Sequence, residues 1–326
     1  MKRRRAPALA GLVVALAGCA SVEAPPAPAS VPSPAAEVTL AVQRTPVGSG
    51  HIAWSELGSG PALVLLNGTA SPMAEWDPAL LAALAGRHRV IVMDYPGLGG
   101  SSPLPGQLTF DALADTVQQW LEAIDVERPN VLGWSMGTFV AQRLAVRHPQ
   151  AAASLLLVGG NPGGSATTLG PRWVQRADSD PNYTTRTYLR TNYPDSSCAQ
   201  AAGLAFLERQ SAAVDSGRFP PDRVPERTYD AMVAAEDPWL RSDRNLRQLA
   251  TLDLPVSVLV GADDVITPPP NSREIADAIP GATLTEVTGA GHSLMFQDPG
   301  GSAALIDELL DEVTAGARRT VSGNCP

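Results

Sequence analysis

Short apolar runs alternate with amphipathic segments along most of the chain from Glu37 onward. Four of the runs, ALVLL, VIVM, LLLV and VSVLV, are apolar at every position except Ser257, as is typical of strands that are covered on both faces. Strands that alternate with helices indicate β-α-β units and a mostly parallel sheet. The predicted strands cover residues 51–55, 61–66, 90–93, 130–132, 154–158, 256–260 and 283–287. The predicted helices cover residues 79–84, 110–124, 136–147, 273–278 and 302–314.

The segment from residue 161 to about 250 interrupts this alternation and contains no clear apolar strand. Aromatic residues such as Trp173 and Trp239 stand there among many polar residues and prolines. Structureless loops of this length are uncommon in compact domains, so we expect a mainly helical insertion over the carboxyl edge of the sheet rather than a disordered loop. The core is then formed by residues 38–160 and 251–318, and residues 319–326 are expected to be a tail.

The composition indicates a folded, acidic protein. Hydrophobic residues make up 44% of the 326 residues, which is enough for a core and excludes wholesale disorder. The net charge of −9 and the pI near 5.0 argue against nucleic acid as a partner, because phosphate binding needs clustered Lys and Arg. The body of the chain has no apolar run of about 18 residues or more, so we expect no internal membrane span.

The first 18 residues have the pattern of a secretory signal peptide. Residues 2–5 are KRRR, and residues 6–17 form an apolar stretch too short for a stable span. The LAGC sequence that ends at Cys19 resembles a bacterial lipobox, which implies that Cys19 is lipidated and becomes the first residue of the mature protein. We therefore expect an extracytoplasmic protein anchored to a bacterial lipid bilayer through acylated Cys19; the alternative is an ordinary signal peptide cleaved nearby and a secreted protein. Residues 19–37, rich in Pro and Ala, are expected to form a semi-rigid linker.

One serine stands in a pentapeptide that favours nucleophilic chemistry. The GWSMG sequence around Ser135 has the G-x-S-x-G form, follows the predicted strand at 130–132 directly and opens a predicted helix. A sharp strand-to-helix turn there lifts the serine above the sheet edge, and small flanking residues permit the crowded backbone. The helix N-terminus offers free N–H groups to a developing oxyanion. The pattern therefore predicts Ser135 as a nucleophile.

A serine hydroxyl is a weak nucleophile, so a base must lie nearby. Four histidines are available, and His292 lies in the glycine-rich sequence GAGHS just after the last predicted strand, where an imidazole can reach the sheet edge. His51 begins an early strand, His88 lies between two arginines, and His148 ends a helix beside a proline. Position and elimination select His292 as the base.

The base needs a carboxylate that orients it. Asp263 and Asp264 both follow the predicted strand at 256–260, so one could orient His292 while the other caps the turn. The chain order Ser, Asp, His is the order that this triad has on one known fold.

These residues together resemble the α/β-hydrolase fold family, over roughly residues 45 to 316. The DYPGLGGS sequence at residues 94–101 is similar to the family's D-x-x-G-x-G-x-S turn, and a Gly-His pair precedes the QDP sequence at 297–299. The resemblance implies an α/β-hydrolase fold, with a mostly parallel sheet flanked by helices and a helical cap formed by the insertion.

The resemblance also assigns roles to residues. The family's G-x-x-D-x-x-x-P pattern aligns Asp264, rather than Asp263, with the acid of the triad. An oxyanion hole formed by the backbone N–H groups of Met136 and Thr69 is implied as well. Two positions depart from the pattern, because Asn67 replaces a frequent histidine and Thr138 replaces a second glycine after the pentapeptide.

The resemblance implies a hydrolase that cleaves an ester of a small-molecule substrate by acyl transfer to water. A serine at the elbow disfavours epoxide and halide chemistry, for which relatives use aspartate, and the absence of an HGGG signature disfavours the lipases and esterases that carry it. No metal site and no cofactor are expected, because the histidines and cysteines are scattered.

Two other functions stay open. A non-catalytic binding protein of the same fold is one, although binding alone does not require the three triad residues together. A proline-type aminopeptidase is the other, in which acidic residues of the insertion would bind a substrate amine. The insertion offers Glu208, Glu226, Asp230, Glu236 and Asp237.

Two cysteines remain beyond the expected anchor, Cys198 in the insertion and Cys325 beside the last residue. An oxidising compartment permits a disulfide between them. The alternative is two unrelated thiols, because a chain end is often poorly ordered.

Overall fold

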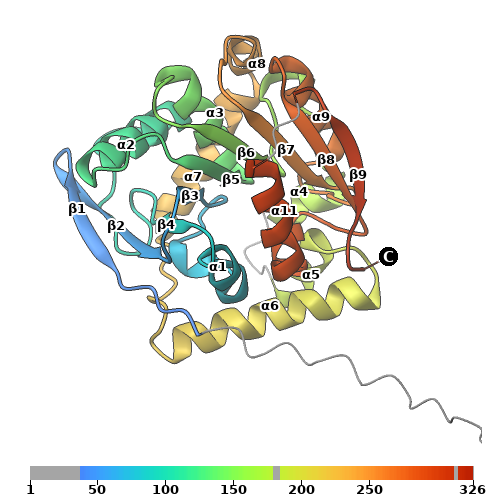
Figure 1. Ribbon diagram of the computed structural model, residues 1–326, viewed down its shortest axis with the longest axis horizontal. Coiled ribbons are helices and arrows are strands. Elements are labelled where there is room, and N and C mark those ends of the chain that lie inside the picture. Colours follow the sequence, from blue (N-terminus) through green and yellow to red (C-terminus); the bar gives the residue numbers. More distant parts are fainter. Residues whose placement is uncertain (1–36, 179–183, 312–314, 326) are drawn as a thin grey trace, which may run out of the picture. The chain divides into compact units, whose positions relative to one another are not determined.

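A nine-stranded sheet forms the centre of the protein (Figure 1). The computed structural model describes residues 37–178, 184–311 and 315–325, so the expected signal peptide, Cys19 and nearly all of the linker lie outside the described residues. The strand order is β1-β2-β4-β3-β5-β6-β7-β8-β9. The pairs β1–β2 and β2–β4 are antiparallel and the others are parallel, which confirms the predicted α/β fold. The strands are β1(Gln43–Val47), β2(Gly50–Leu57), β3(Ala62–Leu66), β4(Arg89–Met93), β5(Asn130–Trp134), β6(Ser154–Val158), β7(Val256–Gly261), β8(Thr283–Thr288) and β9(Arg318–Ser322).

Each face of the sheet carries its own hydrophobic core. Successive side chains of β3 point to opposite faces, so Val64 and Leu66 join one core and Leu63 and Leu65 join the other. All four side chains are fully buried, which explains why the central strands are continuous apolar runs. The first core is covered by α2(Phe110–Ala123), α3(Met136–Arg147), α8(Arg244–Leu249) and α9(Pro269–Ala278). The second is covered by α1(Pro78–Leu84) and α11(Pro299–Asp311).

The two outermost strands carry no apolar run. Residues of β1 and β9 alternate between exposed and partly buried positions, because an edge strand has a neighbour on one side alone. The expectation of a tail at residues 319–326 is therefore wrong for its first part: Arg319 to Ser322 belong to β9, which pairs with β8 in parallel.

Helices form most of the described part of the insertion between β6 and β7. They are α4(Arg172–Asp178), α5(Thr185–Asn192), α6(Ser197–Asp215), α7(Glu226–Leu240) and α8, after a short 3-10 turn η2(Gly164–Ala166). The long helix α6 packs against α1 (Figure 1) and against the short α10(Leu294–Gln297) of the core. Among the described residues, no helix is both long enough and apolar enough to cross a bilayer.

A disulfide joins the insertion to the end of the chain. Cys198 at the start of α6 is bonded to Cys325, across 127 residues of sequence and with a Cα–Cα distance of 5.5 Å. Cys325 is buried against Leu189, Tyr193 and Ala199 of the insertion. The bond therefore fixes the segment after β9 to the helices of the insertion.

Candidate active site

Ser135 occupies a strained turn between β5 and α3. Its φ of 54° and ψ of −124° lie in a region that side chains other than glycine rarely adopt, at a cost of about 1–3 kcal/mol. Glycines permit the turn, because a Cβ atom at Gly133 would overlap the carbonyl group of Gly137, and one at Gly137 would overlap that of Leu66. The two glycines of the pentapeptide thus allow the backbone to bring Ser135 to the sheet edge.

Asp264 and His292 form a buried pair close to this turn. Their side chains lie 2.8 Å apart, from Oδ2 to Nδ1, and each residue is 3% exposed. The neighbouring Asp263 is exposed. A carboxylate can only accept a hydrogen bond, so Nδ1 of His292 carries the proton and Nε2 is left as a proton acceptor.

Further hydrogen bonds hold the Asp264 carboxylate in place. Its Oδ1 accepts the backbone N–H groups of Ile266 and Thr267, both at 2.9 Å, and its Oδ2 accepts the hydroxyl of Thr267 at 2.9 Å. These donors fix which oxygen faces the imidazole. The G-x-x-D spacing found Asp264, whereas nothing in the pattern pointed to Thr267.

The loop that carries His292 rests on the pentapeptide and on a glycine after β6. The indole Nε1 of Trp134 donates to the carbonyl oxygen of His292 at 3.1 Å. Gly159 has a φ of +58°, and a Cβ atom there would lie 3.2 Å from Asp264 Oδ2 and 3.4 Å from His292 Nδ1. A side chain at position 159 would crowd the pair, so glycine leaves the room it needs.

The other three histidines are engaged elsewhere. The Nε2 atom of His51 lies 2.9 Å from the carbonyl oxygen of Gly100, and His88 and His148 each contact an aspartate at 2.7 and 2.8 Å. None of the three lines the cavity at Ser135. The structure thus brings His292, and no other described histidine, to the serine.

A cavity of about 1220 Å³ opens over Ser135 and is also lined by His292, Thr69 and Met136. The contacts of the described residues include no hydrogen bond between Ser135 Oγ and His292 Nε2. They also give no acceptor to the backbone N–H groups of Thr69 and Met136, the two predicted oxyanion donors. Both residues line the cavity, so the oxyanion hole stays a prediction that this arrangement permits.

Both departures from the family's pattern have structural roles. The buried Asn67 donates from Nδ2 to the carbonyl oxygen of Pro72 at 2.7 Å and so braces the loop that carries Thr69. The hydroxyl of Thr138 donates to the carbonyl oxygen of Ser135 at 2.8 Å. Gly160 leaves space for this threonine, since a Cβ atom at position 160 would overlap the Thr138 hydroxyl.

The insertion contributes carboxylates to the cavity. Of the five acidic residues noted in its sequence, Glu226, Asp230 and Glu236 line the cavity, while Glu208 and Asp237 do not. The core contributes Glu75, whose position no sequence pattern indicated; burial raises its pKa to about 7, against a lowering effect of the hydrogen bond with Ser71. In the described part of the chain, no three His, Cys, Asp or Glu side chains gather into a group that could hold a metal ion.

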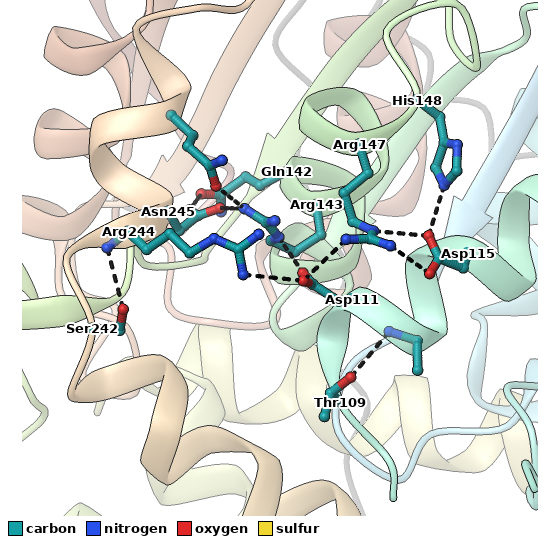
Figure 2. Close-up of polar contacts among 12 residues, drawn as sticks. Thr109, Asp111, Asp115, Gln142, Arg143, Arg147, His148, Ser242, Arg244 and Asn245 are labelled. Atoms are coloured by element: carbon teal, nitrogen blue, oxygen red, sulfur yellow. Dashed lines mark hydrogen bonds and ion pairs between the residues drawn. The ribbon is translucent and has the colours of Figure 1, made fainter. Parts of the chain in front are cut away.

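A polar network lies behind the cavity and ties α2, α3 and α8 together (Figure 2). The buried Arg143 of α3 donates to Asp111 of α2, and to Asn245 and Gln248 of α8 at 3.2 and 2.7 Å. Figure 2 shows Arg147 and Arg244 reaching the same Asp111.

The network continues to the cavity wall. Asn245 donates to Gln142 at 2.8 Å, and Gln142 donates to the carbonyl oxygen of Asn161 at 3.2 Å. The side chain of Asn161 in turn accepts the indole N–H of Trp239 at 2.7 Å. Asn161 and Trp239 line the cavity, so these hydrogen bonds fix its wall to the core.

Comparisons with known proteins agree with the fold. A family model described as the alpha/beta hydrolase fold matches residues 61–299. The structure of an alpha/beta hydrolase fold protein from Chitinophaga pinensis superposes with a TM-score of 0.76 and 22% identity, over 85% of this chain and 99% of that chain.

Curated relatives carry several activities in their names. The non-heme bromoperoxidase BpoC of Mycobacterium tuberculosis is 28% identical over 259 residues, which cover 76% of this chain and 93% of that protein. The pimeloyl-[acyl-carrier protein] methyl ester esterase of Aeromonas hydrophila is 42% identical over 107 residues, which cover 32% of this chain and 40% of the esterase. The polyketide synthase ThaQ of Burkholderia thailandensis is 30% identical over 276 residues, and the chain spans 12% of that much longer protein.

Proposed function

The chain belongs to the α/β-hydrolase fold family, and from this premise we propose that it is a serine hydrolase that cleaves a carboxylic ester of a small molecule. The observation that carries the proposal is the buried hydrogen bond between Asp264 and His292 in the loops next to the strained Ser135 turn. Ser135 and His292 face one cavity large enough for a small-molecule substrate.

In this mechanism, the Ser135 Oγ atom attacks the ester carbonyl carbon while Nε2 of His292 accepts the hydroxyl proton. The carbonyl oxygen becomes an oxyanion that accepts the N–H groups of Met136 and Thr69. The C–O bond then breaks, and His292 gives its proton to the leaving alcohol. Water attacks the acyl-enzyme with His292 again as the base, and the acid and free Ser135 are released. Asp264 keeps the proton on Nδ1 and stabilises the imidazolium throughout.

Two observations support this function over a non-catalytic binding role. A buried, multiply hydrogen-bonded Asp-His pair has a desolvation cost that binding alone gives no reason to maintain. The strained backbone of Ser135 also lowers stability, and such strain is common at active sites. The match to a methyl ester esterase covers 32% of this chain and favours an ester as the substrate.

Labelling with a fluorophosphonate probe tests the proposal. We expect the probe to modify Ser135, and Ser135→Ala and His292→Ala to lose both the label and the hydrolysis of a panel of esters of graded length. Ser165→Ala, which removes a serine outside the cavity, is the matched control and should keep both. Undiminished ester turnover by Ser135→Ala would refute the function.

We also propose that the protein acts outside the cytoplasm, anchored to a bacterial lipid bilayer by acyl chains on Cys19. The disulfide between Cys198 and Cys325 supports an oxidising compartment. Mass spectrometry of the mature protein should find a lipid-modified Cys19 at the N-terminus. An unmodified N-terminus beyond Cys19 would contradict the anchor and leave the secreted form.

A further inference from the structure

The loop that carries His292 lies between the core and the insertion. On the core side, the indole of Trp134 donates to the carbonyl oxygen of His292. On the other side, the loop meets Asn192, the last residue of α5 in the insertion. A Cβ atom at Gly291 would lie 2.5 Å from the carbonyl oxygen of Asn192, so the loop and the end of this helix are in direct contact.

Two hydrogen bonds join Asn192 to the residue that follows His292. The backbone N–H of Ser293 donates to the carbonyl oxygen of Asn192 at 3.1 Å, and the Ser293 hydroxyl donates to Asn192 Oδ1 at 3.0 Å. The last four carbonyl groups of an α-helix have no partner within the helix, so the end of α5 can offer one to the loop. Both residues are buried, which strengthens these hydrogen bonds relative to those in water.

The side-chain amide of Asn192 is held in one orientation. Its Nδ2 atom donates to the carbonyl oxygen of Tyr188 at 3.1 Å and to the hydroxyl oxygen of Thr191 at 3.0 Å. An amide oxygen in that place would face the Tyr188 carbonyl oxygen, which has no proton to donate, so Oδ1 must point to Ser293. The hydroxyl of Tyr188 also lies 3.5 Å from Ser293 Oγ. The end of α5 therefore grips Ser293 through directed hydrogen bonds.

The next helix of the insertion fixes this end of α5. Gln200 of α6 donates from Nε2 to the carbonyl oxygen of Leu189 at 3.2 Å and to that of Pro194 at 2.9 Å, on either side of Asn192. The disulfide described above lies at the start of the same helix. The contact with the loop of His292 is thus built on a braced part of the insertion.

This contact has a consequence for the proposed base. The hydrogen bond to Asp264 fixes the His292 ring at Nδ1, but a ring held at one atom can still swing when the backbone that carries it shifts. Such a shift would move Nε2, the atom that must reach the Ser135 hydroxyl. A misplacement of about 1 Å can cost about 100-fold in rate. Reacting groups need neighbours that lock their geometry, and Ser293 is locked by Asn192.

We propose that Asn192 is a positioning residue for His292, because it fixes, through Ser293, the backbone from which the imidazole reaches Ser135. The inference rests on the proposed hydrolase function and adds a residue of the insertion to those that set the rate of its chemical step. Asn192 lines the cavity, whereas Ser293 does not. A role through Ser293 can therefore be separated from a direct contact between Asn192 and the substrate.

Ser293→Ala and Asn192→Ala, made in the full chain, test the proposal. Each should lower kcat about tenfold on an ester that the wild-type protein hydrolyses and leave KM within about twofold. The rate constant for fluorophosphonate labelling of Ser135 should fall by the same factor, since labelling also needs the base in place. The double variant should stay within about twofold of the slower single variant, because both changes remove the same contact.

Ser257→Ala is the matched control. Ser257 is also buried, and its hydroxyl accepts a hydrogen bond from Thr283 at 3.0 Å and donates to the carbonyl oxygen of Leu309 at 3.4 Å. It pairs with Thr283 at the start of β7 and β8, whereas His292 follows the end of β8, and it does not line the cavity. The control should lose stability in thermal unfolding and keep kcat within about twofold.

Three results would overturn the proposal. An unchanged kcat in Ser293→Ala would do so even if Asn192→Ala failed to fold, since alanine fits the space of serine. A higher KM in Asn192→Ala with Ser293→Ala unaffected would mean that Asn192 contacts the substrate directly. An equal loss of kcat in Ser257→Ala would assign the effect to the loss of any buried hydroxyl.

The outcomes separate this inference from the proposed function. Hydrolysis that is lost in Ser135→Ala but unaffected by Ser293→Ala would sink the positioning role and leave the serine hydrolase intact. A wild-type protein that hydrolyses no ester of the panel and does not react with a fluorophosphonate at Ser135 would remove the function and the inference with it.

Discussion

Replacing Asp264 with Asn tests how the structure sets the tautomer of His292. The Oδ1 atom of Asp264 accepts two backbone N–H groups, from Ile266 and Thr267. In the variant, the amide oxygen must keep this place, because an amide NH₂ group there would face two donors. The NH₂ group then takes the place of Oδ2 and points at His292 Nδ1.

An NH₂ group donates, so Nδ1 must become the acceptor and the proton moves to Nε2. The nitrogen that faces the serine can then no longer accept its proton. A wrong tautomer with intact geometry costs about 10³- to 10⁴-fold in kcat in serine hydrolases with this triad. The fold should be kept, because the Thr267 hydroxyl can rotate to accept from the new NH₂ group.

The assay is steady-state hydrolysis of any ester that the wild-type protein turns over, with thermal unfolding as a check on the fold. Asp263→Asn is the control; this neighbour is exposed, and its kcat should stay within about threefold of wild type while its stability changes by no more than about 1 kcal/mol. If Asp263→Asn were the inactive variant and Asp264→Asn stayed active, the assignment of the acid would be reversed. If both stayed active, the acid would lie elsewhere.

Three other changes probe the surroundings of the site. Gly160→Ala places a methyl group on the Thr138 hydroxyl and should lower the free energy of unfolding by about 1–3 kcal/mol in urea titrations. Adding Thr138→Gly to this variant should restore part of the lost stability. If the double variant is no more stable than Gly160→Ala, the clash with Thr138 is not the cause of the loss. Because burial raises the pKa of folded Glu75 to about 7 from 4.5, its charging opposes folding, so wild-type stability should fall relative to Glu75→Gln between about pH 4.5 and pH 7, by up to about 3 kcal/mol. Urea titrations of both proteins at pH 5 and pH 8 measure this difference in the free energy of unfolding. A difference that is the same at both pH values would contradict the raised pKa. Cys198→Ser should cost about 2–5 kcal/mol in the same titrations, and reductant should lower the wild-type stability alone.

The central strands and the hydrogen-bonded pair of Asp264 and His292 were predictable because they obey local rules. A strand covered on both faces is apolar at nearly every position. The pentapeptide, the G-x-x-D spacing and the loop of His292 follow strand ends whose place in the sheet is fixed. The edge strand β9 was not predictable from sequence. Its side chains are exposed or partly buried, so its RRTVS sequence has no apolar run to mark it as a strand.

The surroundings of the triad could not be read from sequence, because they depend on contacts between distant segments. Thr69 and Glu236 are 167 residues apart, and no spacing rule joins a loop after β3 to a helix of the insertion. Among the five acidic residues of the insertion named above, the helical period alone gave no reason to expect Glu236 rather than the adjacent Asp237 in the cavity. The packing of α7 on Gly97 and Ala70 makes that choice.

The proposed catalytic residues come from the core, whereas part of the cavity lining comes from the insertion. Ser135, Asp264 and His292 follow β5, β7 and β8, so the parallel sheet fixes their relative positions. Glu236 comes from the insertion, lines the same cavity and accepts a hydrogen bond from the Thr69 hydroxyl. A change in α7 can therefore alter the charge that the substrate meets while the triad keeps its geometry. The docking of the insertion on the core thus sets the shape and the charge of the cavity, and the hydrogen bond from Trp239 to Asn161 is part of that docking.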